Sequence, residues 1–302
     1  MDENKEINGI ICLIPHSRIY PLSEKCSTVW KQIGQGFESF FKKFYPYILF
    51  LVLSIRKNYN DIEEYINLVE DVISTKNSNI IVLPLTPRMG KYENRLLDIL
   101  KRFKGQIVAI NVPPNLKAKR ALGKKLRGYV GPNEVEFGKM AGKILFACGK
   151  IIDCIYVLCD KPQHYGYSLR IKGLKVIAKK FGIPVCVIDI NDAKKSRVIC
   201  EMMENNSAFV SLGIIGTEFA LEMQKKYPNK ISAIIAIDLD KKVAENIKNG
   251  NILCTLIQDP IGQGYKAAEL ATSILKQKTS APYTEIFCGP EVVNLNNISQ
   301  YE

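Results

Sequence analysis

Short runs of purely apolar residues alternate with longer amphipathic stretches along this chain of 302 residues. Residues 10–14, for example, read Ile-Ile-Cys-Leu-Ile and have no polar face. A strand that is apolar on both sides needs a parallel sheet with helices on both of its faces. The alternation therefore predicts an α/β protein with doubly wound parallel sheets. The length is sufficient for two such lobes, each with its own core.

The pattern of apolar runs and amphipathic stretches predicts where the strands and helices lie, and their ends predict where a ligand would bind. Loops at the carboxyl ends of the parallel strands should converge on one cleft, which is where open α/β sheets bind ligands. Residues 112–114, with two prolines, form the expected semi-rigid crossover between lobes. Strands are expected at residues 9–14, 47–55, 79–84, 106–111, 128–130, 153–158, 184–190, 207–211, 231–237 and 252–258. Helices are expected at residues 28–44, 61–76, 91–104, 134–148, 166–180, 194–204, 217–226, 241–249 and 263–278.

The chain is basic, with 42 Lys and Arg against 30 Asp and Glu and a formal charge of +12. A basic balance fits a nucleic-acid partner, an anionic surface or a Lys-rich solvated coat. The sequence has no zinc-finger spacing and no RNA-binding signature, so it does not favour nucleic acid. The densest basic run therefore has two interpretations, a solvated helix or loop face and a phosphate-binding patch. This run consists of Lys117, Lys119, Arg120, Lys124, Lys125 and Arg127.

The nine cysteines do not form a recognisable framework, because their number is odd and no CxxC pair occurs. Most of them lie inside apolar runs, where a thiol behaves as a small buried hydrophobe. We therefore expect neither disulfides nor a structural zinc site. This cysteine usage suits a cytosolic protein, or an exported protein of an organism that lives without oxygen. The first six residues lack the apolar core of a signal peptide.

Sequence motifs for catalysis are missing, which argues against an enzyme. The chain has no Walker A motif, no HExxH and no GxSxG. Residues 34–36 read Gly-Gln-Gly, but they lie in a helical pattern and lack the third glycine of a dinucleotide loop. We expect no cofactor, no metal and no catalytic residue.

The polar residues near the expected cleft suit recognition instead. Asp238, at a strand end, would accept charge-assisted hydrogen bonds from hydroxyl groups. Arg170 would donate to ligand oxygens, and Gln258 and Asn111 can each donate and accept, as a sugar hydroxyl does. The further candidates in the loops and nearby helices are His16, Ser17, Trp30, Tyr165 and Asn133.

Each of these residues also has a structural interpretation. Asp238 could cap the helix that follows it. Arg170 could lie on a helix surface, and His16 in an exposed loop. Trp30 and Phe37 lie on one helical face, so they could pack in the core rather than stack on a sugar ring.

Residues 231–271 resemble the type I periplasmic sugar-binding proteins and the effector domains of the lac repressor family. An apolar strand ends in Asp238, Ile-Lys-Asn-Gly follows at 247–250, Thr-Leu-Ile-Gln-Asp-Pro at 255–260 and Gly-Tyr at 264–265. Gly-Pro-Asn-Glu at 131–134 is similar to the family's Gly-x-Asp-Asn, and Arg-Ile-Lys-Gly-Leu at 170–174 to its Arg-x-x-Gly-Phe. Residues 292–298 are similar to its closing strand. The resemblance covers nearly the whole chain and includes the ribose- and xylose-binding proteins.

The resemblance implies two lobes joined by a three-strand hinge, residues 1–111 plus 259–287 and residues 112–258 plus 288–302. It implies that Asp238, Gln258 and Arg170, then Asn111, contact the ligand. Two departures bear on which ligand this is. Leu85 and Thr86 follow Pro84 where the family often has an aspartate, and its Asn-Asp pair near Gly216 is missing.

Two functions fit this family. The first is an extracytoplasmic protein that captures a pentose or hexose by hinge closure and presents it to a membrane partner, an ABC-type uptake transporter or a sensor histidine kinase. The alternative is a cytosolic effector-sensing domain of a lac repressor-like transcription regulator. Neither requires that this chain itself contacts nucleic acid, and the oligomeric state stays open.

Overall fold

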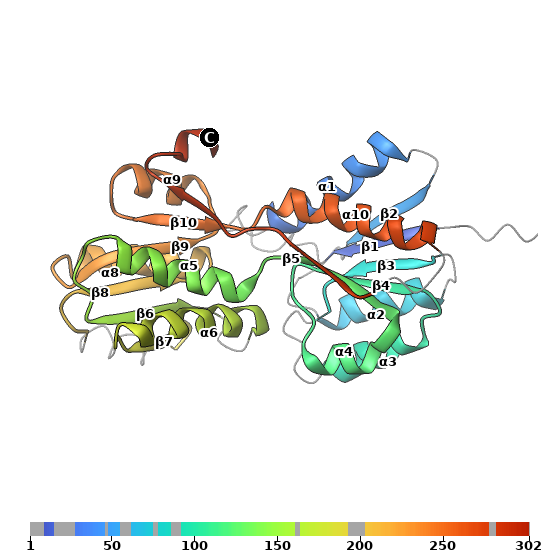
Figure 1. The fold of residues 1–302 in the computed structure, drawn as a ribbon, viewed down its shortest axis with the longest axis horizontal. Coiled ribbons are helices and arrows are strands. Elements are labelled where there is room, and N and C mark those ends of the chain that lie inside the picture. Colours follow the sequence, from blue (N-terminus) through green and yellow to red (C-terminus); the bar gives the residue numbers. More distant parts are fainter. Residues whose placement is uncertain are drawn as a thin grey trace, which may run out of the picture. The chain divides into compact units, whose positions relative to one another are not determined.

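The chain folds into two compact units in the computed structural model, which describes residues 9–14, 28–45, 48–54, 62–74, 78–85, 92–160, 164–192, 203–277 and 282–301. Unit 1 comprises Met1–Pro132 and Asp259–Cys288, and unit 2 comprises Asn133–Gln258 and Gly289–Glu302 (Figure 1). The first boundary lies later than the expected residue 111. Residues 112–132 stay with unit 1 because β5 (Leu126–Gly131) pairs in parallel with β4 (Gln106–Ile110).

Unit 1 is built on a six-stranded parallel sheet with the strand order β11-β5-β4-β3-β1-β2. Successive side chains of β1 enter two different cores, which explains why the strand is apolar on both sides. Ile10 and Cys12 pack with residues of α1 and α10, whereas Ile11 and Leu13 pack with residues of α2 and α3. The other strands are β1 (Gly9–Ile14), β2 (Leu49–Ser54), β3 (Ile80–Leu83) and β11 (Thr284–Phe287). The helices are α1 (Thr28–Phe44), α2 (Ile62–Ser74), α3 (Glu93–Arg102), α4 (Leu116–Leu122) and α10 (Pro260–Gln277). Figure 1 shows these helices on both faces of the sheet.

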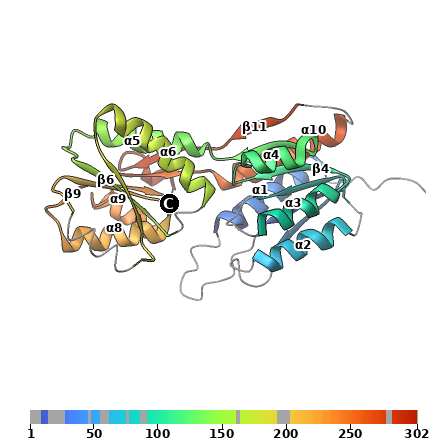
Figure 2. The same ribbon diagram turned by 90° about the horizontal axis from the view of Figure 1, so that it is seen from below.

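Unit 2 repeats this plan with the strand order β12-β10-β9-β8-β6-β7. Its strands are parallel except β12, which pairs antiparallel with β10 at one edge. Figure 2 shows α5 and α6 along one face of the sheet and α8 and α9 along the other. The strands are β6 (Cys154–Cys159), β7 (Val185–Asp189), β8 (Ser207–Ser211), β9 (Ile231–Ile237), β10 (Cys254–Ile257) and β12 (Glu291–Asn294). The helices are α5 (Glu134–Ala147), α6 (Tyr165–Lys180), α8 (Ile214–Lys226) and α9 (Lys241–Lys248), with a 3-10 turn at Ile298–Tyr301; the other 3-10 turn, Gly123–Lys125, lies in unit 1.

The sheets confirm the predicted fold class, two doubly wound α/β lobes. The helix expected at 194–204 lies almost entirely outside the described residues. The glycines of the Gly-Gln-Gly sequence serve packing: a Cβ at Gly36 would come within 2.0 Å of the Ile261 carbonyl oxygen, so glycine lets α1 approach α10 closely.

The basic run of the sequence lies on α4 and the turn after it. Lys117 pairs with Glu93 and Lys119 with Glu285, both at 3.0 Å, and the four side chains lie at the surface of unit 1 or partly within it. This arrangement agrees with the interpretation of the run as a solvated face.

The seven described cysteines are free thiols, and most of them are buried. Burial raises the pKa of Cys254 and Cys159 to about 12, so these thiols behave as apolar core residues. Cys186 differs from the expectation because it is exposed. It lies on β7, the edge strand of the unit 2 sheet.

Candidate functional site

Unusual backbone conformations occur where three strands end. Asn111 follows β4 with φ of 64°, Asp238 follows β9 with φ of 73°, and Asp259 follows β10 with φ of 44°. Positive φ is uncommon outside glycine, and Asn and Asp tolerate it best. Strained residues of this kind cluster at ligand sites, and the carboxyl ends of parallel strands are where such sheets bind ligands.

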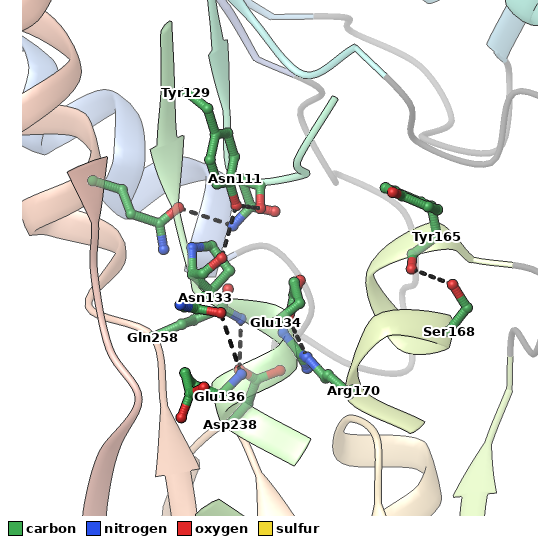
Figure 3. Close-up of polar contacts among 12 residues, drawn as sticks. Asn111, Tyr129, Asn133, Glu134, Glu136, Tyr165, Ser168, Arg170, Asp238 and Gln258 are labelled. Carbon is green, nitrogen blue, oxygen red and sulfur yellow. Dashed lines mark hydrogen bonds and ion pairs between the residues drawn. The ribbon is translucent and has the colours of Figure 1, made fainter. Parts of the chain in front are cut away.

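Asp238 is held at the carboxyl end of β9 by its neighbours on β10. Its backbone N–H donates to the Leu256 carbonyl oxygen at 3.0 Å, and its own carbonyl accepts from Thr255 Oγ1 at 2.7 Å. Gln258 Nε2 donates to Asp238 Oδ1 at 2.8 Å (Figure 3). From the part of the chain that the structure describes, Oδ2 receives no hydrogen bond. Since a carboxylate offers about four acceptor positions, Asp238 can accept further donors from a ligand.

Arg170 lies on α6 and is 5% exposed, so the interpretation of it as a surface residue is wrong. Its Nε donates to Glu134 Oε2 in a short ion pair (Figure 3). Its guanidinium carbon lies 4.9 Å from the Phe137 ring centroid and 5.7 Å from that of Tyr167. The two Nη groups make no hydrogen bond or ion pair with a described residue. Since a guanidinium carries five N–H donors, four stay available to acceptor oxygens.

Glu134 is the first residue of α5 and is as buried as Arg170, with 5% of its surface exposed. A Cβ atom at Gly166 would lie only 2.6 Å from Glu134 Oε1. Glycine in the first turn of α6 therefore leaves room for the Glu134 carboxylate. The amino end of a helix favours negative charge. The backbones of α5 and α6 also approach closely, because a Cβ at Gly173 would lie 2.0 Å from the Val135 carbonyl oxygen.

The ionisable groups of this cluster act on one another. Burial raises the pKa of Glu134, Arg170 opposes that shift, and the charge of Asp238 adds to it. Burial alone would lower the pKa of Arg170, but Glu134 and then Asp238 outweigh it and raise that pKa above its ordinary value. Asp238, Glu134 and Arg170 therefore form one electrostatic unit at the carboxyl edge of the unit 2 sheet.

Asn111 is held in unit 1 by a separate set of contacts. Its Nδ2 donates to Gln263 Oε1 at 3.0 Å, and Gln263 is fully buried in the first turns of α10. The Tyr129 hydroxyl lies 3.0 Å from the Asn111 carbonyl oxygen and 3.0 Å from that of Pro132 (Figure 3). These contacts fix a neutral amide at the carboxyl end of β4.

The other predicted site residues have different surroundings. Trp30 is buried among Phe37, Phe41 and their neighbours, so it belongs to the unit 1 core rather than to an exposed aromatic surface. Asn133 caps α5 by accepting from the Glu136 N–H at 3.2 Å. His16 and Ser17 lie outside the described residues.

The structure shows which tyrosine of α6 lies beside Arg170 and which aspartate caps α9. On α6 it is Tyr167, not Tyr165, whose ring lies beside the Arg170 guanidinium. The spacing of three residues between Tyr167 and Arg170 on one helix was the signal for it. The cap of α9 is Asp240, which accepts from the Val243 N–H at 2.8 Å, so Asp238 is not that cap.

A surface pocket of about 610 Å³ lies elsewhere, between α3 and α4 of unit 1. Its lining includes Leu97, Lys101, Leu116 and Arg120 and none of the predicted ligand contacts. It lies on the helix layer rather than at the strand ends, so the polar cluster of unit 2 is the better candidate for a ligand site.

Two features are missing from the part of the chain that the structure describes. No three His, Cys, Asp or Glu side chains gather closely enough to hold a metal ion. No helix there combines the length and the apolar character needed to cross a bilayer.

Comparison with known proteins identifies the family. Residues 22–279 match the model of the periplasmic binding protein domain, so the chain belongs to this family, whose members bind ligands and are not enzymes. Among curated protein sequences, none matches the chain.

Solved structures with low sequence identity share the fold. A glucose-galactose binding protein from Geobacillus stearothermophilus, GanP, has a TM-score of 0.76 at 16% identity over 97% of this chain and 99% of its own. A periplasmic solute-binding protein of an ABC transporter from Actinobacillus succinogenes, with bound D-allose, has a TM-score of 0.74 at 20% identity over 97% and 100%. A putative LacI transcriptional regulator from Bacteroides fragilis has a TM-score of 0.73 at 14% identity over 98% and 99%.

Proposed function

We propose that this protein binds a small sugar, a pentose or hexose, and that Asp238, Gln258 and Arg170 of unit 2 and Asn111 of unit 1 contact it. The observation that carries the proposal is the Asp238 cluster. It combines a carboxylate that accepts only one hydrogen bond from the described residues with a buried arginine whose Nη donors have no partner among them. A sugar hydroxyl donates and accepts at once, so neighbouring hydroxyls match this pairing of acceptor and donor.

The solved relatives support a sugar as the ligand class. GanP is described as a glucose-galactose binding protein, and the Actinobacillus succinogenes protein holds D-allose. A solute-binding protein from Agrobacterium radiobacter, 17% identical, holds D-arabinose. These relatives bind different sugars, so they favour the class and do not select xylose or ribose for this chain.

We infer further that the protein works outside the cytoplasm and presents its ligand to a membrane partner, an ABC-type uptake transporter or a sensor histidine kinase. Solved structures described as periplasmic binding proteins of ABC transporters, from Actinobacillus succinogenes and Legionella pneumophila, support this role. The second candidate is a cytosolic effector-sensing domain of a transcription regulator. The similarity to the LacI regulator of Bacteroides fragilis and the free, buried thiols favour it.

A thermal-shift screen tests the proposed function. We expect one or a few sugars in a panel of neutral pentoses, hexoses and inositols to raise the melting temperature. A ligand at about 100 times its dissociation constant adds about 2.7 kcal/mol to the free energy of unfolding, which corresponds to several degrees in a chain of this size. Nucleosides and amino acids serve as controls. A shift for one of these controls alone, with every sugar silent, would contradict the proposal.

A further inference from the structure

Among the described residues, carboxylates outnumber cations in the cluster formed by Asp238, Glu134 and Arg170 of unit 2. Burial is the largest cause that raises the pKa of the Tyr167 hydroxyl, the charges of Asp160, Asp238 and Glu134 add to it, and the charge of Arg170 opposes it. Among the described residues around the guanidinium, the two carboxylates of Glu134 and Asp238 act on one arginine, Arg170.

The pairing within the cluster leaves the excess charge on Asp238. Glu134 takes the ion pair of Arg170, since Arg170 Nε binds Glu134 Oε2. Asp238 is held by the neutral amide of Gln258 at 2.8 Å. No described Lys, Arg or His lies within ion-pair distance of the Asp238 carboxylate. The carboxylate expected to contact the ligand is therefore not neutralised by a direct partner in the described part of unit 2.

Glu134 also limits what Arg170 can do. An arginine without a carboxylate partner would attract an anionic ligand group strongly, through a bidentate pair. Here the guanidinium is stacked on Phe137 and Tyr167 and paired through Nε, so its charge is compensated before a ligand arrives. Its Nη donors can still bind neutral hydroxyl or ring oxygens.

We propose that the unit 2 site selects neutral and amino-bearing sugars over anionic ones and that Glu134 is the residue that sets this selectivity. The inference rests on the proposed function, because it names the class of sugar that the same site takes. Glu134 acts through Arg170 and is a positioning residue. A carboxylate or phosphate group on the sugar would meet Asp238 as a like charge, and like charges placed together at an interface are strongly unfavourable.

The test compares matched sugars that differ only in charge. Titration calorimetry measures the affinities of D-galactose, D-galactosamine and D-galacturonate and of the corresponding D-glucose, D-glucosamine and D-glucuronate. For each series the wild type should bind the neutral or amino sugar at least about tenfold more tightly than the uronate. Uronate binding as tight as that of its neutral counterpart would overturn the selectivity while leaving the proposed function in place. Failure of all six of these sugars, together with every sugar of the thermal-shift panel, would instead overturn the proposed function.

The Glu134→Gln variant assigns the selectivity to this residue. It should reduce the ratio of the neutral-sugar affinity to the uronate affinity by about tenfold, because glutamine removes one negative charge and keeps the shape of the side chain. Glu136→Gln is the control, because Glu136 lies on the same helix, pairs with Lys139 at 2.6 Å and is 39% exposed. An unchanged ratio in Glu134→Gln, or an equal change in Glu136→Gln, would overturn the role of Glu134.

A salt titration of the wild type tests the electrostatic origin of the selectivity without any variant, should Glu134→Gln unfold. Raising the ionic strength screens charge repulsion, so uronate affinity should improve relative to that of the neutral sugar. A ratio that does not depend on salt would overturn an electrostatic origin.

Discussion

Replacing Asp238 by asparagine is expected to weaken sugar binding by about 100-fold or more, because two charge-assisted hydrogen bonds from ligand hydroxyls are each worth about 1.5–3 kcal/mol. Asparagine has the same shape and tolerates the φ of 73° that Asp238 adopts, so the fold should be retained. The remaining Oδ1 can still accept from Gln258 Nε2. Titration calorimetry with the best sugar of the thermal-shift screen measures the loss.

Asp240→Asn is the matched control for this change. Asp240 lies two residues further along, and its carboxylate caps α9 by accepting from the Val243 N–H at 2.8 Å. Asparagine caps a helix about as well as aspartate, so this variant should keep both its stability and its sugar affinity. Equal losses of affinity in the two variants would show that the charge of the region matters and not a contact of Asp238.

The second large effect concerns the ion pair between α5 and α6. Glu134→Ala should lower the free energy of unfolding by about 3–5 kcal/mol, because it leaves the buried Arg170 guanidinium without a partner. Both side chains are buried, with 4% and 5% exposed. The double variant Glu134→Ala with Arg170→Leu should recover much of the loss, since no unpaired charge then stays buried. Urea unfolding followed by circular dichroism measures both values.

An exposed pair supplies the control for this measurement. Glu218 pairs with Lys242 at 3.1 Å, with both side chains 46% exposed, and Glu218→Ala should cost no more than about 1 kcal/mol. If Glu134→Ala proved as mild as Glu218→Ala, the buried pair would not be the structural centre of the site.

The fold was predictable from the sequence because its strands are covered on both faces. In β1, Ile10 and Cys12 pack into one core and Ile11 and Leu13 into the other, so every position of the strand must be apolar. Such a continuous apolar run is typical of a parallel strand with helices on both faces of its sheet. The edge strands were harder to predict. Sequence periodicity missed β11 (Thr284–Phe287), because its side chains are half-buried or exposed and give no continuous apolar run.

The candidate site was predictable in part. Asp238 and Gln258 were expected together because each follows a strand and carboxyl ends of neighbouring parallel strands meet. The partner of Arg170 was not, because Glu134 lies 36 residues away and reaches it only through the close packing of α5 on α6. Trp30 shows the opposite limit. Its helical spacing with Phe37 fits a ligand stack and a core equally well, and only the surrounding side chains of unit 1 decide for the core.

Amide chemical-shift mapping tests the location of the site most directly. A transverse-relaxation-optimised nitrogen–proton spectrum of the labelled protein is recorded with and without the best sugar of the screen. We predict that saturable shifts include the amides of Arg170, Asp238, Thr255 and Gln258. Shifts confined to the α3–α4 pocket around Lys101 and Arg120, with those four amides unchanged, would contradict the account.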